Sequence, residues 1–505
     1  MTSISRRAFL KGTAGVAAIT VLPLAALSTW VYISSDVTNR GTVRFDTPLK
    51  IPPLLDQEGD APIELELREG RVELLPGKVA DTWGINGDYL GPTIRTRPGA
   101  DLTLNVHNLL PETTTMHWHG AKLPAVADGG PHQPIDPGAT WTASFTVEQP
   151  PATLWYHSHP HGTTATHVYR GLAGMLIIAD EEDGLPHTYG VDDIPLIIQD
   201  RSFTDAGQLT MDDDRLIGSS LIGPLGTDIL VNGTWGPTQE ITRELTRFRI
   251  LNASNARIYN LRFDTGKSFH VIATDTGFLP APVEVDAYRL SPGERVEILV
   301  RFEPGERVRL ISRDVDLGGL FVVERLAGGD DTFELVELRA ADDLVSAGEL
   351  PPELPSPPQV SAPAAATERE FELGDFNTIN GRAMDMERID LVVPAGQDEV
   401  WVVRNGSMNP HNFHIHNATF NVVDIDGEPP APARSGHKDT VYVPPGSTVR
   451  LAVSFGHHVD ERHPYMAHCH ILIHEDTGMM LQFLIVEPGR EQEVDLRLDL
   501  GHEHH

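Results

Sequence analysis

Short runs of alternating apolar and polar residues recur along the whole chain and are separated by turns. One run, at 102–106, reads Leu-Thr-Leu-Asn-Val, and related strand-like runs lie at 248–252 and 400–405. A period of two residues places apolar side chains on one face of a β-strand. The 39 prolines and 45 glycines supply turns between such runs. The pattern therefore predicts an all-β protein of short strands joined by turns.

One short sequence motif occurs three times. It begins with an apolar residue followed by Asn-Gly, at Asn86, Asn232 and Asn380, and each copy leads into one of the runs described above. The asparagines are 146 and 148 residues apart, which is one domain length in each case. Repeats of this length indicate tandem copies of a whole domain. Strands with Pro and Gly turns at this size favour a Greek-key β-sandwich.

The length of 505 residues is too great for one ordinary core, and three tandem domains account for it. The predicted division is an N-terminal export segment at 1–40, a first domain at 45–182, a second domain at 190–340, a Pro- and Ala-rich linker at 341–369, a third domain at 370–490 and a histidine-rich tail at 491–505. Histidine clusters occur in the first and third domains, and the second has almost no histidine. We therefore expect a metal site shared by the first and third domains, with the second as a spacer.

The net charge and the N-terminal segment indicate which partners the protein can bind and where in the cell it is located. A formal charge of −33 repels nucleic-acid phosphates, so we expect no nucleic-acid partner. Arg6 and Arg7 precede an uncharged, mostly apolar run at 12–35. This is typical of a twin-arginine export signal and is also long enough to remain as a membrane anchor. We expect a monomer that is exported and is periplasmic, extracellular or anchored outside the cytoplasm.

Four short clusters of histidine stand out. They are His117-Trp118-His119, His157-Ser158-His159, His411-Asn412-Phe413-His414-Ile415-His416 and His468-Cys469-His470. Residues two apart in a strand point to the same face, so each His-x-His pair can present two imidazoles to neighbouring metal ions. A single pair is weak evidence for a ligand site. Four pairs in two related domains favour one strongly.

Cys469 is the only cysteine of the chain, and its spacing to other residues is informative. His474 follows it by five residues and Met479 by ten, and His411 lies upstream in the same domain. Two histidines, one cysteine and a weak axial methionine are the ligands of a blue-copper electron-transfer site. The two histidines that flank Cys469 would point to the opposite side of a strand. Metals held there would be joined to the thiolate by a few backbone bonds, a short covalent route for electrons.

In these motifs the chain resembles the multicopper oxidases, most closely the bacterial three-domain laccases and copper-efflux oxidases. The similarity covers roughly 90–486 and is strongest at 468–480. It implies three cupredoxin-like domains and four copper ions per chain: one type 1, one type 2 and a type 3 pair. The resemblance assigns type 1 to His411, Cys469, His474 and Met479, type 2 to His117 and His414, and type 3 to His119, His157, His159, His416, His468 and His470.

The resemblance also implies two acids that supply protons for the reduction of O2 to water. Asp128 precedes two glycines after the first histidine pair, and Glu475 directly follows His474. Water formation consumes protons, so a buried carboxyl group at the site would have a clear task. From the residues alone two alternatives stay open. Asp128 is also typical of an ordinary turn, and Glu475 of a solvated acid at a strand end.

The implied activity is that of a laccase-like oxidase, which couples one-electron oxidation of small phenolic or aromatic donors to four-electron reduction of O2. Copper-efflux members carry a methionine-rich insert, whereas the linker at 341–369 contains no methionine. Oxidation of Cu(I) for copper detoxification is therefore the alternative. A copper nitrite reductase lacks the type 3 pair, and a copper-free relative such as the family's cell-division scaffold would have lost ligands. Both are disfavoured because every ligand position is filled.

Overall fold

The computed structural model describes residues 37–57, 59, 61–180, 184–212, 222–361, 366–375 and 377–498. Nearly all regular structure in this part of the chain is β-strand, so the prediction of an all-β fold is confirmed. The twin-arginine motif and the last seven residues of the histidine-rich tail lie outside the described residues. Among the residues described, no helix combines the length and apolar character needed to cross a membrane.

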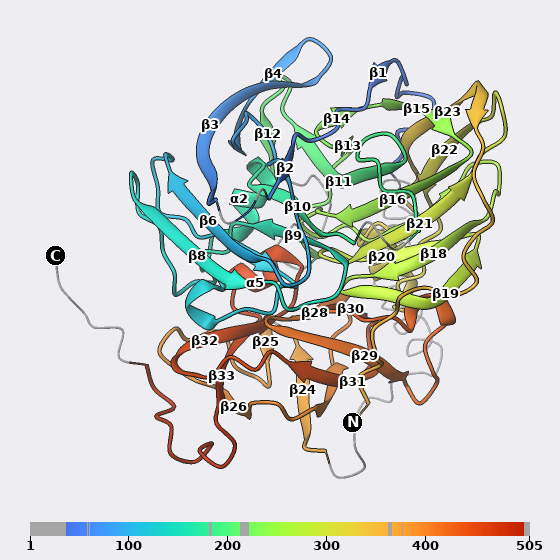
Figure 1. Ribbon diagram of the computed structural model, residues 1–505. Coiled ribbons are helices and arrows are strands. Elements are labelled where there is room, and N and C mark those ends of the chain that lie inside the picture. The colour runs from blue at the N-terminus through green and yellow to red at the C-terminus, as the bar shows by residue number, and fades with distance from the viewer. Residues whose placement is uncertain are drawn as a thin grey trace, which may run out of the picture.

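The first third of the chain forms two sheets that share one core (Figure 1, blue to cyan). The sheet orders are β4-β3-β6-β8 and β2-β5-β10-β9-β7. Leu65 and Leu104 of the first sheet pack with Ile94 and Leu154 of the second. The strands are β2 (Leu54–Asp56), β3 (Ile63–Leu75), β4 (Lys78–Ile85), β5 (Thr93–Thr96), β6 (Asp101–Asn108), β7 (His117–His119), β8 (Thr140–Thr146), β9 (Ala152–His157) and β10 (Ala173–Ile178).

The middle third forms a second pair of sheets (Figure 1, green to yellow), with orders β1-β15-β23-β22-β17-β20 and β14-β13-β11-β16-β21-β18-β19, and with β12 paired to β11. The strand β1 near the start of the chain lies parallel to β15, so it joins this sheet. The strands are β1 (Thr47–Pro48), β11 (Asp193–Phe203), β12 (Leu209–Thr210), β13 (Asp228–Val231), β14 (Thr234–Trp235), β15 (Pro237–Arg243), β16 (Leu245–Asn252), β17 (Tyr259–Phe263), β18 (Phe269–Thr274), β19 (Gly277–Val285), β20 (Tyr288–Leu290), β21 (Arg295–Arg301), β22 (Arg307–Ser312) and β23 (Phe333–Val345).

The last third forms the third pair of sheets at the bottom of Figure 1, with orders β25-β24-β27-β31-β29 and β26-β33-β32-β28-β30. Phe371 and Trp401 of one sheet pack against Phe413 and Phe483 of the other. The strands are β24 (Glu368–Gly374), β25 (Thr378–Ile379), β26 (Leu391–Pro394), β27 (Glu399–Asn405), β28 (His411–Ile415), β29 (Ala418–Ile425), β30 (Thr440–Val443), β31 (Thr448–Phe455), β32 (Asp460–His468) and β33 (Met480–Val486).

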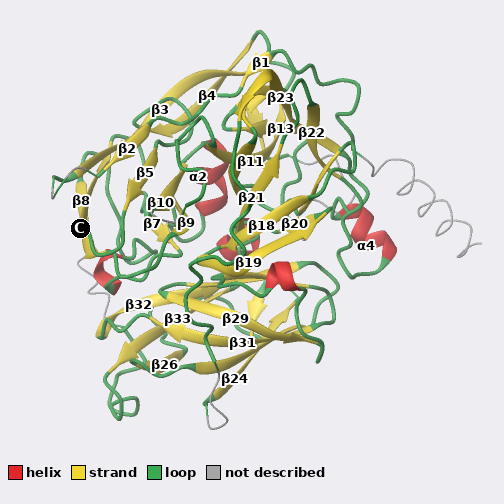
Figure 2. Ribbon diagram, turned by 45° about the vertical axis from the view of Figure 1, so that its right-hand side comes forward, coloured by secondary structure: helices red, strands yellow, loops and turns green. Residues whose placement is uncertain are grey.

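These three pairs of sheets are called the first, second and third sandwich below. Strands distant in sequence lie parallel in each of them, for example β3 with β6, β11 with β16 and β24 with β27. The described helices are short and lie in connections between strands (Figure 2). They are η1 (Ala125–Ala127), α2 (Thr164–Arg170), α4 (Phe321–Leu326), η2 (Pro432–Arg434) and α5 (Leu472–Asp476).

The repeated Asn-Gly asparagines occupy the same structural position in all three sandwiches. Their φ angles are 54°, 51° and 53°, in the left-handed region that asparagine tolerates better than most residues. Each side-chain oxygen accepts a backbone N–H from a neighbouring strand, and each side-chain amide donates to the carbonyl two residues before that N–H. The partners are Glu66 and Glu64 for Asn86, Ile197 and Pro195 for Asn232, and Glu372 and Glu370 for Asn380.

A second set of asparagines ends the strands that follow these turns: Asn108, Asn252 and Asn405. Each side-chain oxygen accepts the N–H two residues later, and each amide donates to two loop carbonyls. The sequence comparison stopped the first run at residue 106 and so missed Asn108 as the counterpart of the other two. The internal repeat therefore preserves the hydrogen bonds that hold strand ends as well as the apolar pattern.

We expect Asn405→Ala to lower the free energy of unfolding by about 2–3 kcal/mol, because it removes the side-chain donor to the buried Val443 carbonyl and the acceptor of the buried Ser407 N–H. Thermal unfolding followed by circular dichroism should show a midpoint about 5–10 °C lower. Asn105→Ala, which removes an amide near the surface of β6, is the matched control and should shift the midpoint very little. Equal shifts in the two variants would contradict the structural role of Asn405.

Candidate metal centre

The predicted ligands lie where the first and third sandwiches meet. His117 and His157 are paired residues of β7 and β9, and His414 and His468 are paired residues of β28 and β32. All twelve predicted ligand side chains are buried, with at most 2% of any residue exposed. Strand β32 ends at His468, so Cys469 lies just beyond the strand on which it was expected.

Eight imidazoles converge in this seam. His159 Nε2 lies 3.1 Å from His468 Nε2, and His416 Nε2 lies 3.2 Å from the same atom. Rings of the two sandwiches also stack on one another, with centroids 3.6–3.8 Å apart. The stacked pairs are His117 with His416 and His119 with His414.

The surroundings of these rings fit a metal ion. Buried nitrogens of several rings have no hydrogen-bond partner among the described residues, for example His117 Nε2, His157 Nε2 and His414 Nε2. The other nitrogen of each of these three rings bonds a backbone carbonyl, of Asp128, Ser158 and Asp439 respectively. Such bonds fix the tautomer of a metal ligand and leave its second nitrogen free.

Burial also keeps the imidazoles neutral. It lowers the pKa of His117, His157 and His470 well below the usual range, and it lowers the pKa of His159 and His468 to about 4. Near neutral pH each ring therefore carries one free lone pair, and nitrogens that face each other at 3.1 Å can share either a proton or a metal ion. Imidazole donors suit copper, among other transition metals.

A second group of donors lies on the other side of Cys469. The Cys469 Sγ is 3.5 Å from His411 Nδ1 and 3.6 Å from His474 Nδ1, and these two nitrogens are 3.1 Å apart. Met479 is fully buried in the same apolar core, and its carbonyl accepts the Cys469 N–H at 3.1 Å. Burial raises the pKa of the Cys469 thiol to about 12, so a neighbouring cation is needed to stabilise the thiolate. The soft sulfur and two imidazoles fit copper.

Both predicted acids are buried and contact ligand positions. The Asp128 Oδ2 accepts a hydrogen bond from His416 Nδ1 at 2.8 Å. Glu475 lies between two rings, with its oxygens 3.4 Å from His159 Nδ1 and 3.2 Å from His468 Nδ1. Burial raises the pKa of Asp128 well above its usual range and also raises that of Glu475. These positions disfavour the alternatives of an ordinary turn residue and a solvated acid.

The structure adds Asp439, which the sequence did not single out. Its carboxylate lies 3.0 Å from His119 Nε2, and its carbonyl accepts from His414 Nδ1 at 2.9 Å. Asp439 immediately precedes β30, which pairs with the ligand-bearing strand β28. No histidine spacing marks it. The only feature of the sequence that could have indicated Asp439 is that an acid stands next to Thr440 at the start of a strand.

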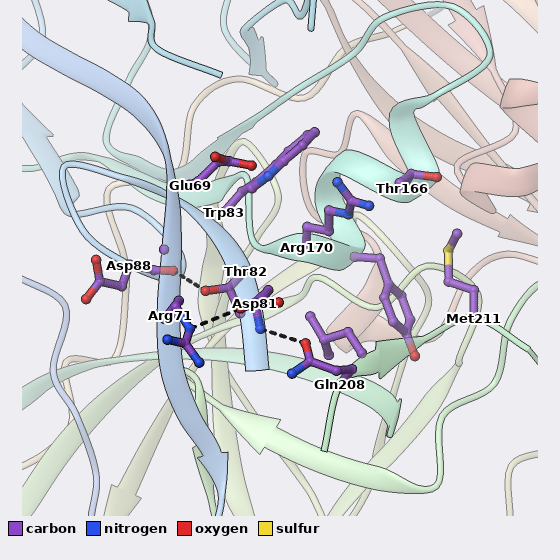
Figure 3. A pocket seen from close by; sticks show the side chains of 13 residues that line it. Glu69, Arg71, Asp81, Thr82, Trp83, Asp88, Thr166, Arg170, Gln208 and Met211 are labelled. Atoms are coloured by element: carbon purple, nitrogen blue, oxygen red, sulfur yellow. Dashed lines mark hydrogen bonds and ion pairs between the residues drawn. The ribbon is translucent and has the colours of Figure 1, made fainter. Parts of the chain in front are cut away.

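An open pocket of about 900 Å³ lies apart from these groups, between β3, β4 and α2 (Figure 3). The Arg170 guanidinium lies 4.6 Å from the centre of the Trp83 ring, and both residues line the pocket. Acids, arginines and apolar side chains are mixed along its wall, and none of them is a predicted ligand. The pocket is therefore not part of the metal centre.

The fold and the site together define a cupredoxin-like protein with a thiolate–imidazole group beside an imidazole cluster. Comparisons with known proteins agree. Two family models, both described as multicopper oxidase, match residues 66–183 and 349–489. The chain belongs to the multicopper oxidases. This implies a copper-dependent oxidoreductase that passes electrons from a reductant to O2, as the sequence led us to expect.

Individual relatives carry different names. The cell division protein FtsP of Escherichia coli is 36% identical over 447 residues, covering 87% of this chain and 92% of its own length. The multicopper oxidase mco of Staphylococcus epidermidis is 35% identical, with coverages of 85% and 90%. The crystal structure of a laccase from Pediococcus acidilactici superposes with a TM-score of 0.79 at 35% identity, covering 88% of this chain and 95% of that one.

We expect the purified protein to bind close to four copper ions per chain and to be intensely blue. Cys469→Ser should abolish the blue absorption, because a serine oxygen cannot supply the thiolate-to-copper charge transfer, and should leave the copper of the eight-imidazole cluster in place. Metal analysis and visible absorption check both expectations. His107→Gln, a histidine outside both groups, is the control and should match the wild type. A blue Cys469→Ser protein would contradict the assignment of the thiolate ligand, and two coppers or none in the wild type would contradict the expected four-copper centre.

Proposed function

We propose that the protein is a laccase-like oxidase with four coppers per chain, which oxidises small phenolic or aromatic donors one electron at a time and reduces O2 to water. The supporting observation is that all twelve ligand positions are filled, buried and grouped as two donor sets. Those sets are joined at Cys469, whose thiol faces one set while its flanking histidines face the other.

In this proposal the type 1 copper is held by His411, Cys469, His474 and Met479. The type 2 copper is held by His117 and His414, and the type 3 pair by His119, His157, His159, His416, His468 and His470. When bound, the coppers supply one-electron redox chemistry and a binding place for O2. The chain contributes ligand orientation and a dry site. The link from Cys469 to the neighbouring His468 is short, because the Cys469 carbonyl also accepts from His468 Nδ1 at 3.1 Å.

Asp128 and Glu475 are proposed to pass protons to the forming water. Each touches a ligand histidine, Asp128 at His416 and Glu475 at His159. A carboxyl group that burial keeps protonated to higher pH is suited to general-acid catalysis. Their contacts with the rings also keep both carboxyl groups close to the site where O2 is reduced.

Similarity to a cell division protein does not decide against an oxidase. The identities to FtsP and to a multicopper oxidase, 36% and 35%, are nearly equal, so overall similarity cannot separate the two functions. The ligand set can separate them, since a protein without copper has no need to bury ten imidazoles and a thiol. Copper analysis is the direct test, and a copper-free wild type would favour the scaffold.

The choice of aromatic donors is supported by an apolar rim near the His411 end of β28. Leu320 and Phe321, at the start of α4, are 64% and 56% exposed, and Met408, three residues before His411, is 61% exposed. A methyl group at Gly319 would lie 3.9 Å from the Met408 carbonyl oxygen, so these segments are adjacent. Exposed apolar side chains grouped in this way are typical of a binding surface.

Oxidation of Cu(I) is the second candidate. Met408 is a soft thioether at this rim, but no other methionine is among the exposed large apolar residues of the described chain. Soft Cu(I) needs several such ligands to be held tightly. The net charge of −33 favours cationic or neutral donors over anionic ones at low salt.

We further propose export by the twin-arginine route, action as a monomer outside the cytoplasm, and the division into domains at 45–182, 190–340 and 370–490. The basis for export is Arg6-Arg7 followed by an apolar run. Each proposed domain contains most strands of one sandwich, although β1 joins the second sandwich from the N-terminal side.

We expect a neutral phenol to be oxidised faster than low-micromolar Cu(I) in the same buffer, as measured by O2 consumption. Phe321→Ser should raise KM for the phenol several-fold with kcat within about twofold, because it removes apolar contact area that binds the donor before electron transfer. Leu109→Ser, also about half exposed but on the first sandwich, is the matched control. Much faster oxidation of Cu(I), or an unchanged KM in Phe321→Ser, would contradict the aromatic-donor proposal.

We expect Asp128→Asn and Glu475→Gln to keep all coppers and yet to slow turnover by at least about tenfold, because each loses a proton donor. Stopped-flow measurements should show normal reduction of the blue copper and slow reoxidation by O2. Asp136→Asn, an exposed acid on the same loop as Asp128, should behave as wild type. Normal reoxidation in both site variants across pH would remove these acids from the mechanism.

A further inference from the structure

We propose that Arg295, from the histidine-poor second sandwich, is a positioning residue of the eight-imidazole cluster. It holds Asp439 in the place from which Asp439 fixes the ring orientation of His119. This inference rests on the proposed copper site, and it gives the second sandwich a direct part in that site. The evidence comes from the hydrogen bonds of three side chains that are all fully buried: His119, Asp439 and Arg295.

His119 presents a different nitrogen from its neighbours. Its Nε2 lies 3.0 Å from Asp439 Oδ1, and its Nδ1 is buried with no partner among the described residues. In His117, His157 and His414 the arrangement is reversed, with Nδ1 bonded and Nε2 free. The hydrogen bond of one ring nitrogen determines which nitrogen a histidine offers to a metal. Asp439, together with the Thr440 hydroxyl that lies 3.1 Å from the same Nε2 and donates to Asp439, therefore selects Nδ1 of His119 as the atom that faces the cluster.

Neighbouring side chains fix the position of the Asp439 carboxylate, because both of its oxygens accept hydrogen bonds from them. Oδ1 accepts from Arg295 Nη1 at 2.8 Å and from the Thr440 hydroxyl at 2.8 Å, in addition to His119. Oδ2 accepts from Arg295 Nη2 at 2.5 Å. The carbonyl of Asp439 bonds His414, whose ring stacks on His119 with centroids 3.6 Å apart. One residue thus orients two adjacent ligands, and the bidentate pairing with Arg295 holds that residue in one place.

Arg295 is itself held by all five of its N–H groups. Besides the two bonds to Asp439, Nε donates to the Thr153 carbonyl at 2.9 Å, Nη1 to the Gly293 carbonyl at 2.9 Å and Nη2 to the Asp275 carbonyl at 3.1 Å. Thr153 belongs to the first sandwich and Asp439 to the third, so one guanidinium joins all three sandwiches. A lysine has three donors and no planar fork, and it cannot reproduce this arrangement.

Two glycines leave room for this pair beside the ligands. Gly120 directly follows His119 and has a φ of +87°; a Cβ there would lie 2.4 Å from Asp439 Oδ2 and 2.7 Å from Arg295 Nη2. Gly293, two residues before Arg295, has a φ of +80°, and a Cβ there would lie 3.0 Å from the His470 ring. A side chain at Gly120 would therefore collide with the Asp439–Arg295 pair, and one at Gly293 would press on a ring of the cluster.

Arg249 provides a matched control for a purely structural role. It is also a buried arginine of the second sandwich, and it also bonds Thr153 of the first, with Nη1 2.9 Å from the Thr153 hydroxyl. It also forms ion pairs with Glu297 and Asp193. Loss of either arginine removes a buried ion pair and a hydrogen bond to Thr153 of the first sandwich. Of the two, only Arg295 bonds the acid that orients His119.

The test compares Arg295→Met, Arg295→Lys and Arg249→Met in the copper-loaded protein. We expect Arg295→Met to lower copper affinity of the cluster about 10-fold, the lower end of the effect of removing a direct partner of a metal ligand, because Arg295 acts on His119 through Asp439. Type 3 absorption in the near ultraviolet should fall with it, while the blue absorption per chain is kept. Arg249→Met should retain both signals, and Arg295→Lys should recover less than half of the loss. Equal copper affinities in Arg295→Met and Arg249→Met would overturn the proposal.

A copper-free measurement separates this inference from the proposed function. In apoprotein labelled with ¹⁵N-histidine, His119 (assigned with His119→Gln) should carry its proton on Nε2 in the wild type and in Arg249→Met. It should become a mixture of tautomers in Arg295→Met, or in Arg295→Lys if the methionine variant does not fold. An unchanged Nε2–H tautomer in the Arg295 variant would overturn the proposal. A wild type that binds no copper would instead contradict the proposed oxidase and leave this result valid.

Discussion

The rest of the structure depends on bringing eight neutral imidazoles out of water into one seam between two sandwiches. Desolvation lowers their pKa values, so the rings keep their lone pairs, and facing nitrogens come as close as 3.1 Å. Such an arrangement is costly unless a cation or an N–H···N hydrogen bond joins the facing nitrogens and the remaining nitrogen of each ring finds a partner. Backbone carbonyls of Asp128, Ser158 and Asp439 meet part of that need. The strand ends at the seam are therefore constrained in backbone position as well as in side-chain identity.

The same constraint explains why the second sandwich reaches the site. We expected it to be a spacer because it has almost no histidine, but its turn before β21 lies against the cluster. The Asn412 amide donates to the Pro292 carbonyl at 2.7 Å, and the Asn412 oxygen accepts the His470 N–H at 2.6 Å. Arg295, a few residues after Pro292, forms an ion pair with Asp439. A sandwich without ligands thus supplies charge and backbone that keep ligands of the other two oriented.

The sequence was sufficient for features that follow from local pattern. Alternating runs and the three Asn-Gly pairs predicted the all-β fold and its repeats, because Asn86, Asn232 and Asn380 each hold the same left-handed turn. Period-two spacing brought each histidine pair to one seam. Features that depend on contacts between distant segments were not predictable. Arg295 and Asp439 are 144 residues apart with no shared spacing, and the pairing of β1 with β15 joins segments about 190 residues apart.

This division between local pattern and distant contact bears on how relatives should be interpreted. The asparagine turns, strand ends and apolar cores that define the sandwiches involve far more residues than the copper site does. Identity of 35–36% to both a cell division protein and a multicopper oxidase is therefore mainly a measure of shared framework. The proposed oxidase activity would depend on only a dozen ligands and on the few residues that orient them. In this chain, Asp128, Glu475 and the Arg295–Asp439 pair around the proposed ligand set thus bear on redox function more directly than overall identity does.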